Sequence, residues 1–158
     1  MALKNVFRVI VDYGKSLAEM KKAGSFDLIE LDISVPHFPI IGSGTAVLDI
    51  ELITYAFKYM SFYDMLQDLE GRGLRSVILQ ELLAFGATNP DLQRKYPICC
   101  LGSIWESRHT GHRYVPYLNN YGCLGKSERS LLLHDLDLFP PFGNDSRFAA
   151  VRKQDFVD

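Results

Sequence analysis

The part of the chain from Gly73 to Lys153 constrains the fold most, because one helical pattern is followed there by several short strand patterns. The helical pattern, GLRSVILQELLAFG, turns Leu79, Leu82 and Leu83 to one side. The strand patterns are short apolar segments, and we expect strands at 98–106, 113–118, 130–138 and 147–152. This order describes an architecture and not yet a reaction.

The chain before Gly73 predicts strands and two short helices. Residues 6–13 are rich in β-branched and aromatic side chains, which favours a strand. Ser16 and Glu19 then have the spacing of a helix capping box, and Gly24 suits the left-handed end of that helix. Ser61 precedes a second helix, whose apolar side chains form one stripe: Phe62, Met65, Leu66 and Leu69.

Two segments between these helices alternate between apolar and polar residues. Residues 45–55 predict a strand with one apolar face made of Ala46, Leu48, Ile50 and Leu52. Residues 26–33 alternate in the same way, and we expect Ile29, Leu31 and Ile33 to share a face. The connecting residues 36–44 predict a loop, because their two prolines cannot donate to a strand ladder.

These patterns together predict an α+β protein. We expect an N-terminal strand-and-helix lobe at residues 1–72, packed on a compact half at 73–158 with short antiparallel strands. No Pro/Ser-rich linker separates the two parts, so one cooperative unit is expected. The 158 residues, 47% of them apolar, are enough for a core that needs no metal or disulfide staple.

Charge and cysteine content exclude several classes of protein. A net charge of −2 argues against a general nucleic-acid binder, which usually carries a basic excess. Cys99 and Cys100 are adjacent in an apolar run, so buried free thiols in a reducing compartment are expected instead of a disulfide framework. The sequence contains neither a signal-peptide pattern nor an apolar run long enough for a membrane span, so we expect a cytoplasmic protein without a membrane partner.

The second half contains residues that carry a resemblance to a known fold family. They are Gly73-Leu74-Arg75, Gln80-Glu81-Leu82, Leu101-Gly102-Ser103 and the final Arg147-Phe148-Ala149-Ala150-Val151-Arg152. This pattern resembles the C-type-lectin-like fold, including its bacterial branches related to the formylglycine-generating enzyme. The whole chain also resembles small uncharacterised bacterial proteins, some of them carried on mobile elements.

The resemblance implies a lectin-like second half whose ligand sites lie in the loops beyond the closing strands. Ile78 stands where the pattern has a capping threonine, so Ser76 is the expected helix cap. The paired cysteines of an oxidising active site and a Glu-Pro-Asn calcium–sugar motif are both missing from the sequence. Asn144 and Asp145 resemble the second lectin calcium motif, although Phe142 replaces its tryptophan.

Two groups of residues are candidates for chemistry. His109 and His112 could bind zinc or copper, but a Thr-Gly hairpin tip explains their spacing. His134 and Asp135 could form an acid–base pair, but alternation along a strand turns them to opposite faces. We therefore expect no metal site, no cofactor and no catalytic residue, and keep a small enzyme using these residues as an alternative.

The leading interpretation is a non-enzymatic module that binds a protein or a small polar ligand. Aromatic, arginine and amide side chains concentrate around loops 106–126 and 139–146, and such mixtures are typical of recognition surfaces. The candidate ligand-binding residues are Trp105, Arg108, Arg113, Tyr114, Tyr117, Asn119, Asn120, Tyr121, Asn144 and Asp145. A third alternative is a homodimer whose edge strands pair across subunits.

Overall fold

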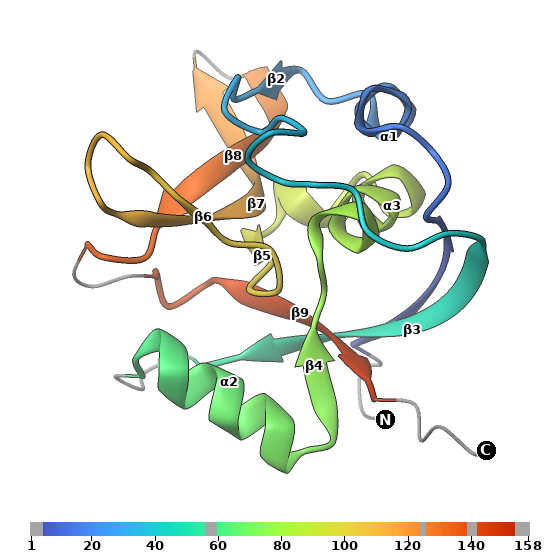
Figure 1. Ribbon diagram of the computed structural model, residues 1–158. Coiled ribbons are helices and arrows are strands. Elements are labelled where there is room, and N and C mark those ends of the chain that lie inside the picture. Colours follow the sequence, from blue (N-terminus) through green and yellow to red (C-terminus); the bar gives the residue numbers. More distant parts are fainter. Residues whose placement is uncertain (1–4, 56–59, 124–125, 139–141, 154–158) are drawn as a thin grey trace.

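The protein is an α+β fold in which three helices pack on one mixed sheet, as expected (Figure 1). The structure is a computed structural model that describes residues 5–55, 60–123, 126–138 and 142–153. Within these residues the helices are α1 (Leu17–Gly24), α2 (Phe62–Gly71), α3 (Leu79–Thr88) and a short 3-10 turn at Leu92–Arg94. The strands are β1 (Val6–Asp12), β2 (Leu28–Ile29), β3 (Thr45–Thr54), β4 (Leu74–Ser76), β5 (Ile98–Cys99), β6 (Trp105–Glu106), β7 (Arg113–Cys123), β8 (Lys126–Asp135) and β9 (Arg147–Arg152).

The sheet joins strands from both halves of the chain. Its order is β1-β3-β9-β5-β7-β8-β2, with β4 added beside β9 and β6 beside β7. The last strand, β9, therefore lies between β3 from the first half and β5 from the second half (Figure 1). Most pairs are antiparallel, but β5 runs parallel to β9 and β2 runs parallel to β8. The border of the sheet on one side is β1.

Both faces of the central strands are buried. One core contains α1, α3 and the inner residues of β1 and β3, and the other contains α2 and the opposite face of β5, β7 and β9. Cys99 and Cys100 illustrate this, because they are adjacent, free and buried in different cores. Burial raises the pKa of Cys100 to about 12 and that of Cys99 further, so neither thiol is a ready nucleophile.

The first half follows its sequence pattern closely, except at the end of α1 and after it. β1, β3 and α2 form where expected, and Ser61 and Asp64 make a complete capping box. The left-handed residue after α1 is Ser25, with a φ of 50°, and not Gly24. Gly24 is instead needed for space, since a Cβ there would lie 2.2 Å from the Phe26 ring.

The prediction that Ile29, Leu31 and Ile33 share a strand face is wrong. Only Leu28 and Ile29 pair with β8, and the chain then turns, with Ile33 N–H donating to the Glu30 carbonyl. The turn buries Ile33 completely and leaves Leu31 94% exposed. A two-residue strand is too short for alternation to decide which side chains lie inside.

The helical pattern that begins at Gly73 is interrupted in the structure. Leu74–Ser76 forms β4, antiparallel to β9, and α3 starts only at Leu79. Ser76 does not cap α3, because its hydroxyl accepts from Leu101 N–H at 2.7 Å. Ser103 instead accepts from Leu79 N–H at 2.8 Å. Gly102 allows this close crossing, since a Cβ there would meet the Val77 carbonyl oxygen at 2.4 Å.

The later strands also have different bounds from those expected. The segment 98–106 is two short strands, β5 and β6, separated by the Gly102 crossing. β7 and β8 form a long antiparallel hairpin. β7 continues past the predicted end at residue 118, and β8 begins before the predicted start at residue 130. Strand propensity alone could not place these ends, because hydrogen bonding between β7 and β8 extends both strands beyond their apolar residues.

A buried arginine joins the helices to this hairpin. The Arg129 side chain, on β8, donates to the carbonyls of Gly24 at 2.6 Å, Gly86 at 2.8 Å and Pro90 at 3.0 Å. Gly24 ends α1, Gly86 lies in the last turn of α3, and helix C-termini favour a positive charge. Arg129, only 5% exposed, thereby holds α1 and α3 against the sheet.

None of the helices in the described residues is long and apolar enough to cross a membrane.

Candidate functional site

The predicted recognition residues are divided between the two faces of the sheet. Trp105 and Tyr114 are directly opposite each other on β6 and β7, and Trp105 packs against the core under α1 and α3. Tyr117 packs against the other core, and Arg113 lies over Phe62 and Tyr63 at the start of α2. The sequence could not show this division, because alternate residues of one strand reach opposite faces.

The first group is an aromatic stack around Trp105. The ring of His37 lies parallel to the indole, with ring centroids 4.0 Å apart and an interplanar angle of 14°. Tyr114 is the second neighbour, with a centroid distance of 5.4 Å. The sequence pattern gave no sign of the part played by His37, because this residue comes from the proline-containing loop that follows β2.

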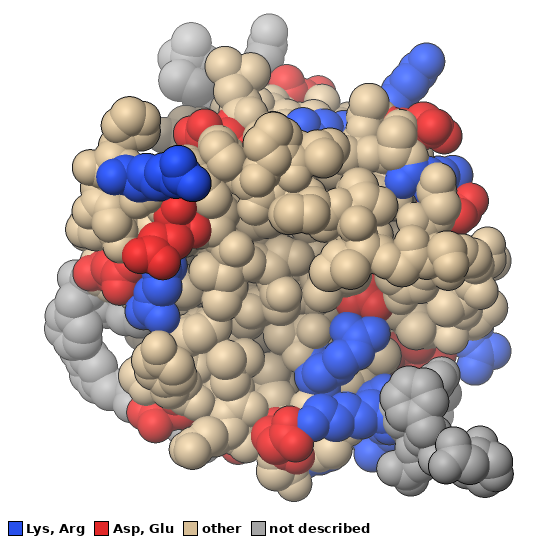
Figure 2. Space-filling model, viewed as in Figure 1, with Lys and Arg blue, Asp and Glu red and all other residues tan. Residues whose placement is uncertain are grey.

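Exposed apolar side chains lie beside this stack. Val35 is 51% exposed and belongs to the compact turn that positions His37, while Ile104 is 43% exposed and precedes Trp105. We call the set Leu31, Val35, His37, Ile104, Trp105 and Tyr114 the Trp105 surface. Figure 2 shows a broad uncharged stretch over the middle of this face, which the segment after β2 crosses in Figure 1, and a group of charged residues of both signs around β6 at its left.

His112 and Asp135 form a polar pair at the edge of the Trp105 surface. His112 Nδ1 is 2.7 Å from Asp135 Oδ2, and Asp135 is directly opposite Tyr114 in the β7–β8 ladder. The hydrogen bond to Asp135 raises the pKa of His112. Both histidines belong to the predicted hairpin tip between β6 and β7, and His109 is exposed there. Across the described ranges, no group of three or more His, Cys, Asp or Glu side chains could hold a metal ion.

The second group surrounds Arg113 on the other face. Arg113 Nη2 donates to Asp137 Oδ1 at 3.2 Å, and Arg113 Nη1 donates to Tyr63 Oη at 3.3 Å. The backbone N–H of Arg113 also donates to Asp137 at 2.7 Å, and these hydrogen bonds lower the pKa of Asp137. This arrangement joins the β7–β8 hairpin to the start of α2.

His134 is separated from Asp135, as alternation predicts. Its ring stacks on Phe142 with centroids 4.3 Å apart and meets Tyr117 edge to face. Burial lowers the pKa of His134, and its Nε2 atom is buried with no hydrogen-bond partner among the described residues. His134 therefore belongs to the interior beside α2, while Asp135 belongs to the Trp105 side.

The remaining candidate residues do not converge on either group. Asn120 lies farther along β7, where it accepts from Ser127 at 2.8 Å. The carbonyl of Asn119 accepts from the buried Gln93 side chain, and Tyr121 is 61% exposed. Three others are exposed on loops: Arg108, Asn144 and Asp145.

A buried carboxylate that the sequence left without a role connects the helix layer to β4. Glu81 is 1% exposed and accepts from Arg75 through both oxygens at 2.8 Å, from Tyr13 Oη at 2.6 Å and from Ile78 N–H at 2.9 Å. Burial alone would raise the pKa of Glu81, but these hydrogen bonds together lower it. Burial and the bond to Glu81 raise the pKa of Tyr13 to about 12. With every acceptor site used, Glu81 is a structural group.

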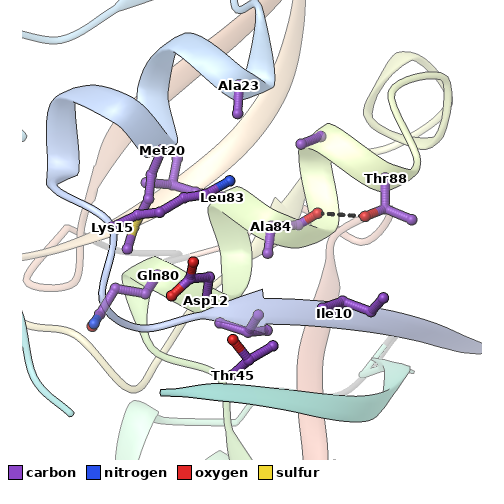
Figure 3. Close-up of a pocket in the computed structure, with 12 residues that line it drawn as sticks. Ile10, Asp12, Lys15, Met20, Ala23, Thr45, Gln80, Leu83, Ala84 and Thr88 are labelled. Carbon is purple, nitrogen blue, oxygen red and sulfur yellow. Dashed lines mark hydrogen bonds between the residues drawn. The ribbon is translucent and has the colours of Figure 1, made fainter. Parts of the chain in front are cut away.

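A pocket of about 310 Å³ opens where α1 and α3 meet β1 (Figure 3). Its apolar lining is Ile10, Val11, Met20, Ala23, Leu83, Ala84 and Ala87, and its polar lining is Asp12, Lys15, Thr45, Gln80 and Thr88. None of the sequence-predicted site residues lines it. The signal that could have indicated it is the group of small residues on α3, because alanines leave space between packed elements.

Comparison of the chain with models of known families, with curated proteins and with solved structures gave no match.

Proposed function

We propose that the protein is a non-enzymatic recognition module, and that the Trp105 surface binds another protein. The observation that carries this proposal is the exposure of Val35 (51%) and Ile104 (43%), which are close in the chain to the stacked rings of His37 and Trp105. Leu31, 94% exposed, precedes Asp32, whose carbonyl lies 2.9 Å from His37 Nδ1. Single exposed apolar residues are common on monomers, but a group next to an aromatic anchor is typical of an interface centre.

The polar groups around the Trp105 surface support a protein partner. The His112–Asp135 pair and the exposed Arg108 and Glu106 supply hydrogen-bonding and charged groups at its margin. An apolar centre with a polar rim is the usual composition of a protein–protein interface.

A small polar ligand fits this surface less well. His37 already covers one face of the Trp105 indole in a stack of 4.0 Å, so that face is not free for a sugar ring or a base. Small-molecule sites are usually concave, whereas this surface consists of a loop and a hairpin tip lying side by side.

The test compares binding by variants of the exposed loop. Leu31→Asp/Val35→Asp adds two charges to the surface at positions whose side chains lie outside the core, so the fold should survive. Proteins captured from cell extract by the wild type would be purified and titrated calorimetrically against each variant. We expect the double variant to weaken binding about ten-fold or more.

Tyr121→Asp is the matched control, since it adds a charge at another exposed apolar position on β7. Its binding should equal that of the wild type. A partner that binds the double variant as tightly as the wild type would contradict the proposal. So would a small-molecule thermal shift that needs Trp105 while no protein partner binds.

A small enzyme is the second candidate, on the evidence of the His112–Asp135 pair alone. The 2.7 Å hydrogen bond and the raised pKa of His112 are features of a general-base pair. The pair lies outside the pocket between α1 and α3, and His134 faces the opposite core. A reaction that His112→Gln abolishes in the folded protein would establish this alternative.

A further inference from the structure

The outer edge of β1 has free backbone groups at known positions. In the β1–β3 ladder, Leu52 N–H donates to the Asn5 carbonyl and Tyr13 N–H donates to the Gly44 carbonyl, so odd-numbered residues of this strand bond to β3. Antiparallel ladders alternate, and the N–H and C=O groups of Arg8 and Ile10 therefore point away from β3. No other strand in the described residues pairs with this edge.

We propose that this edge pairs with β1 of a second copy of the chain, and that the two strands run antiparallel about an axis at Ile10. In this register Ile10 faces Ile10 of the second copy, and Arg8 faces Asp12 of the second copy. Each copy thus forms the same contacts, as a two-fold interface requires.

Charge complementarity selects this register over its neighbours. Arg8 Nε already donates to Asp49 Oδ1 of its own copy at 3.2 Å, and the proposed register adds Asp12 of the second copy as a further carboxylate beside the same guanidinium. An axis at Val9 places Arg8 opposite Ile10 and Asp12 opposite Val6, which leaves both charges facing apolar residues. An axis at Arg8 places two arginines opposite each other, which is destabilising. Only the axis at Ile10 pairs the positive side chain with the negative one on both sides of the axis.

Exposed apolar residues support the same axis. Ile10 is 65% exposed, and its partner across the β1–β3 ladder, Val47, is 57% exposed. Joining two copies at Ile10 makes a continuous row of Val47, Ile10, Ile10 and Val47 across the two strand pairs. An apolar strand edge of this kind is a template for pairing unless a protein blocks or uses it.

The helix layer leaves room for the second copy. The residues of α1 and α3 nearest this edge include Ala23, Ala84 and Ala87, which line the pocket together with Ile10 and Asp12 of β1 (Figure 3). These small side chains leave the pocket open beside the edge. The second copy would meet this opening beside the longer side chains of Lys15, Met20 and Leu83, which also line the pocket.

The proposal is independent of the Trp105 surface, which lies around β6 and the loop after β2. It predicts a dimer by light scattering during size-exclusion chromatography and by sedimentation equilibrium. Ile10→Pro should give a folded monomer, because the lost N–H points outward and the β1–β3 ladder is kept. The control is Glu128→Lys, which changes a charge at an exposed residue of β8 and should remain a dimer.

A charge exchange tests the register. Each charge variant also carries Asp49→Asn, because Asp49 pairs with Arg8 inside one copy and would repel a glutamate at that position. In this background Arg8→Glu and Asp12→Lys should each shift the protein toward monomer, and the combination of both changes should recover the dimer because the pair is restored with reversed sign. Circular dichroism and a thermal melt would show that each variant is folded. A further check is a short bismaleimide cross-linker in a Cys123→Ser background: Ile10→Cys should give a covalent dimer and Arg8→Cys should not.

Several outcomes would overturn the proposal. A wild type that stays monomeric at its highest soluble concentration would exclude the dimer. A dimer that persists in both Ile10→Pro and Asp12→Lys would use another surface. A double charge variant that stays monomeric while folded, or equal cross-linking of the Arg8→Cys and Ile10→Cys variants, would exclude the register.

Discussion

Glu81 and Asp137 each accept hydrogen bonds from an arginine, but they lie in regions that use the pair differently. The Glu81 side chain is 1% exposed and receives donors from Arg75, Tyr13 and a backbone N–H, which fix it from several directions. The Asp137 side chain is 33% exposed and bonds mainly to one residue, Arg113. Buried charge must be fully paired to be tolerated, whereas surface charge is already solvated by water.

The comparison indicates where the molecule can change without unfolding. The helix layer over β1, β3 and β4 depends on buried charged groups, and so its residues are tied to the fold. The hairpin surfaces around Arg113 and Trp105 carry exposed groups that can differ with little effect on stability. The recognition role that we propose would lie on these hairpin surfaces, where sequence change should affect binding more than folding.

The largest effect should come from Arg129→Met. This change removes the donor to four carbonyls, those of Gly24, Ser25, Gly86 and Pro90, in a largely buried place. We expect a loss of roughly 3–5 kcal/mol in the free energy of unfolding, measured by urea denaturation. Arg94→Met is the control, since the Arg94 side chain is 37% exposed, and it should change stability far less. Similar losses in both variants would contradict the structural role given to Arg129.

Glu81→Gln should have the next largest effect. The amide keeps the volume but loses the charge that holds Arg75 and Tyr13, and we expect a loss of about 2–3 kcal/mol in urea. The pKa of Glu81 is lowered in the fold, so its contribution is complete above the unfolded value and disappears as the pH falls through the folded value. The difference between wild type and variant should therefore shrink in acid. A difference that is constant down to low pH would show that the charge is not responsible.

Asp137→Asn should change stability too little to separate from the wild type in the same urea experiment, because water reaches the partly exposed Arg113 side chain after the change. This is the direct counterpart of Glu81→Gln, with a carboxylate replaced by its amide in both regions. Equal losses for the two variants would remove the distinction between the buried and the exposed pair.

We expect the smallest effects on stability from the protonation of His112 and His134, and NMR can measure the titration of each ring. The pKa of His134 is lowered by burial, so stability from neutral His134 is present above its unfolded value of 6.5 and is lost as the pH falls below it. The pKa of His112 is raised, so its contribution is present below 6.5 and is lost as the pH rises through the folded value. The two ring signals should therefore titrate on opposite sides of 6.5. Asp135→Asn should lower the pKa of His112, which loses its hydrogen bond, and should lower that of His134 further, because the Asp135 charge raises it in the wild type.

Local sequence patterns predicted the regular elements of the first half well. β1 and β3 have sequences typical of strands, and α2 has a regular apolar stripe and a clear N-terminal cap. Local preferences are enough to specify such elements. The pattern failed at Leu31 and Ile33, where the chain turns after a strand of two residues. It also failed at Leu74–Ser76, because pairing with β9 is a contact between segments far apart in the chain.

The candidate site was only partly accessible to sequence reasoning. The concentration of aromatic residues indicated Trp105 and Tyr114, and the hairpin tip at His109–His112 was correctly placed. The contribution of His37 was missed, because this loop residue is far from Trp105 in the sequence and only the tertiary structure brings the two rings together. The sequence also did not indicate that β1 is the strand with an open edge, since no local pattern shows which strand lies at the border of a sheet.

The sequence by itself determined the α+β class, the strongly periodic elements and the burial of the adjacent cysteines, because these depend on side chains near one another in the chain. The tertiary structure decided the strand order, the division of β7 between two faces, the use of Arg129 and Glu81, and the border position of β1. Those features depend on contacts between distant segments, where packing and hydrogen bonding outweigh local preference.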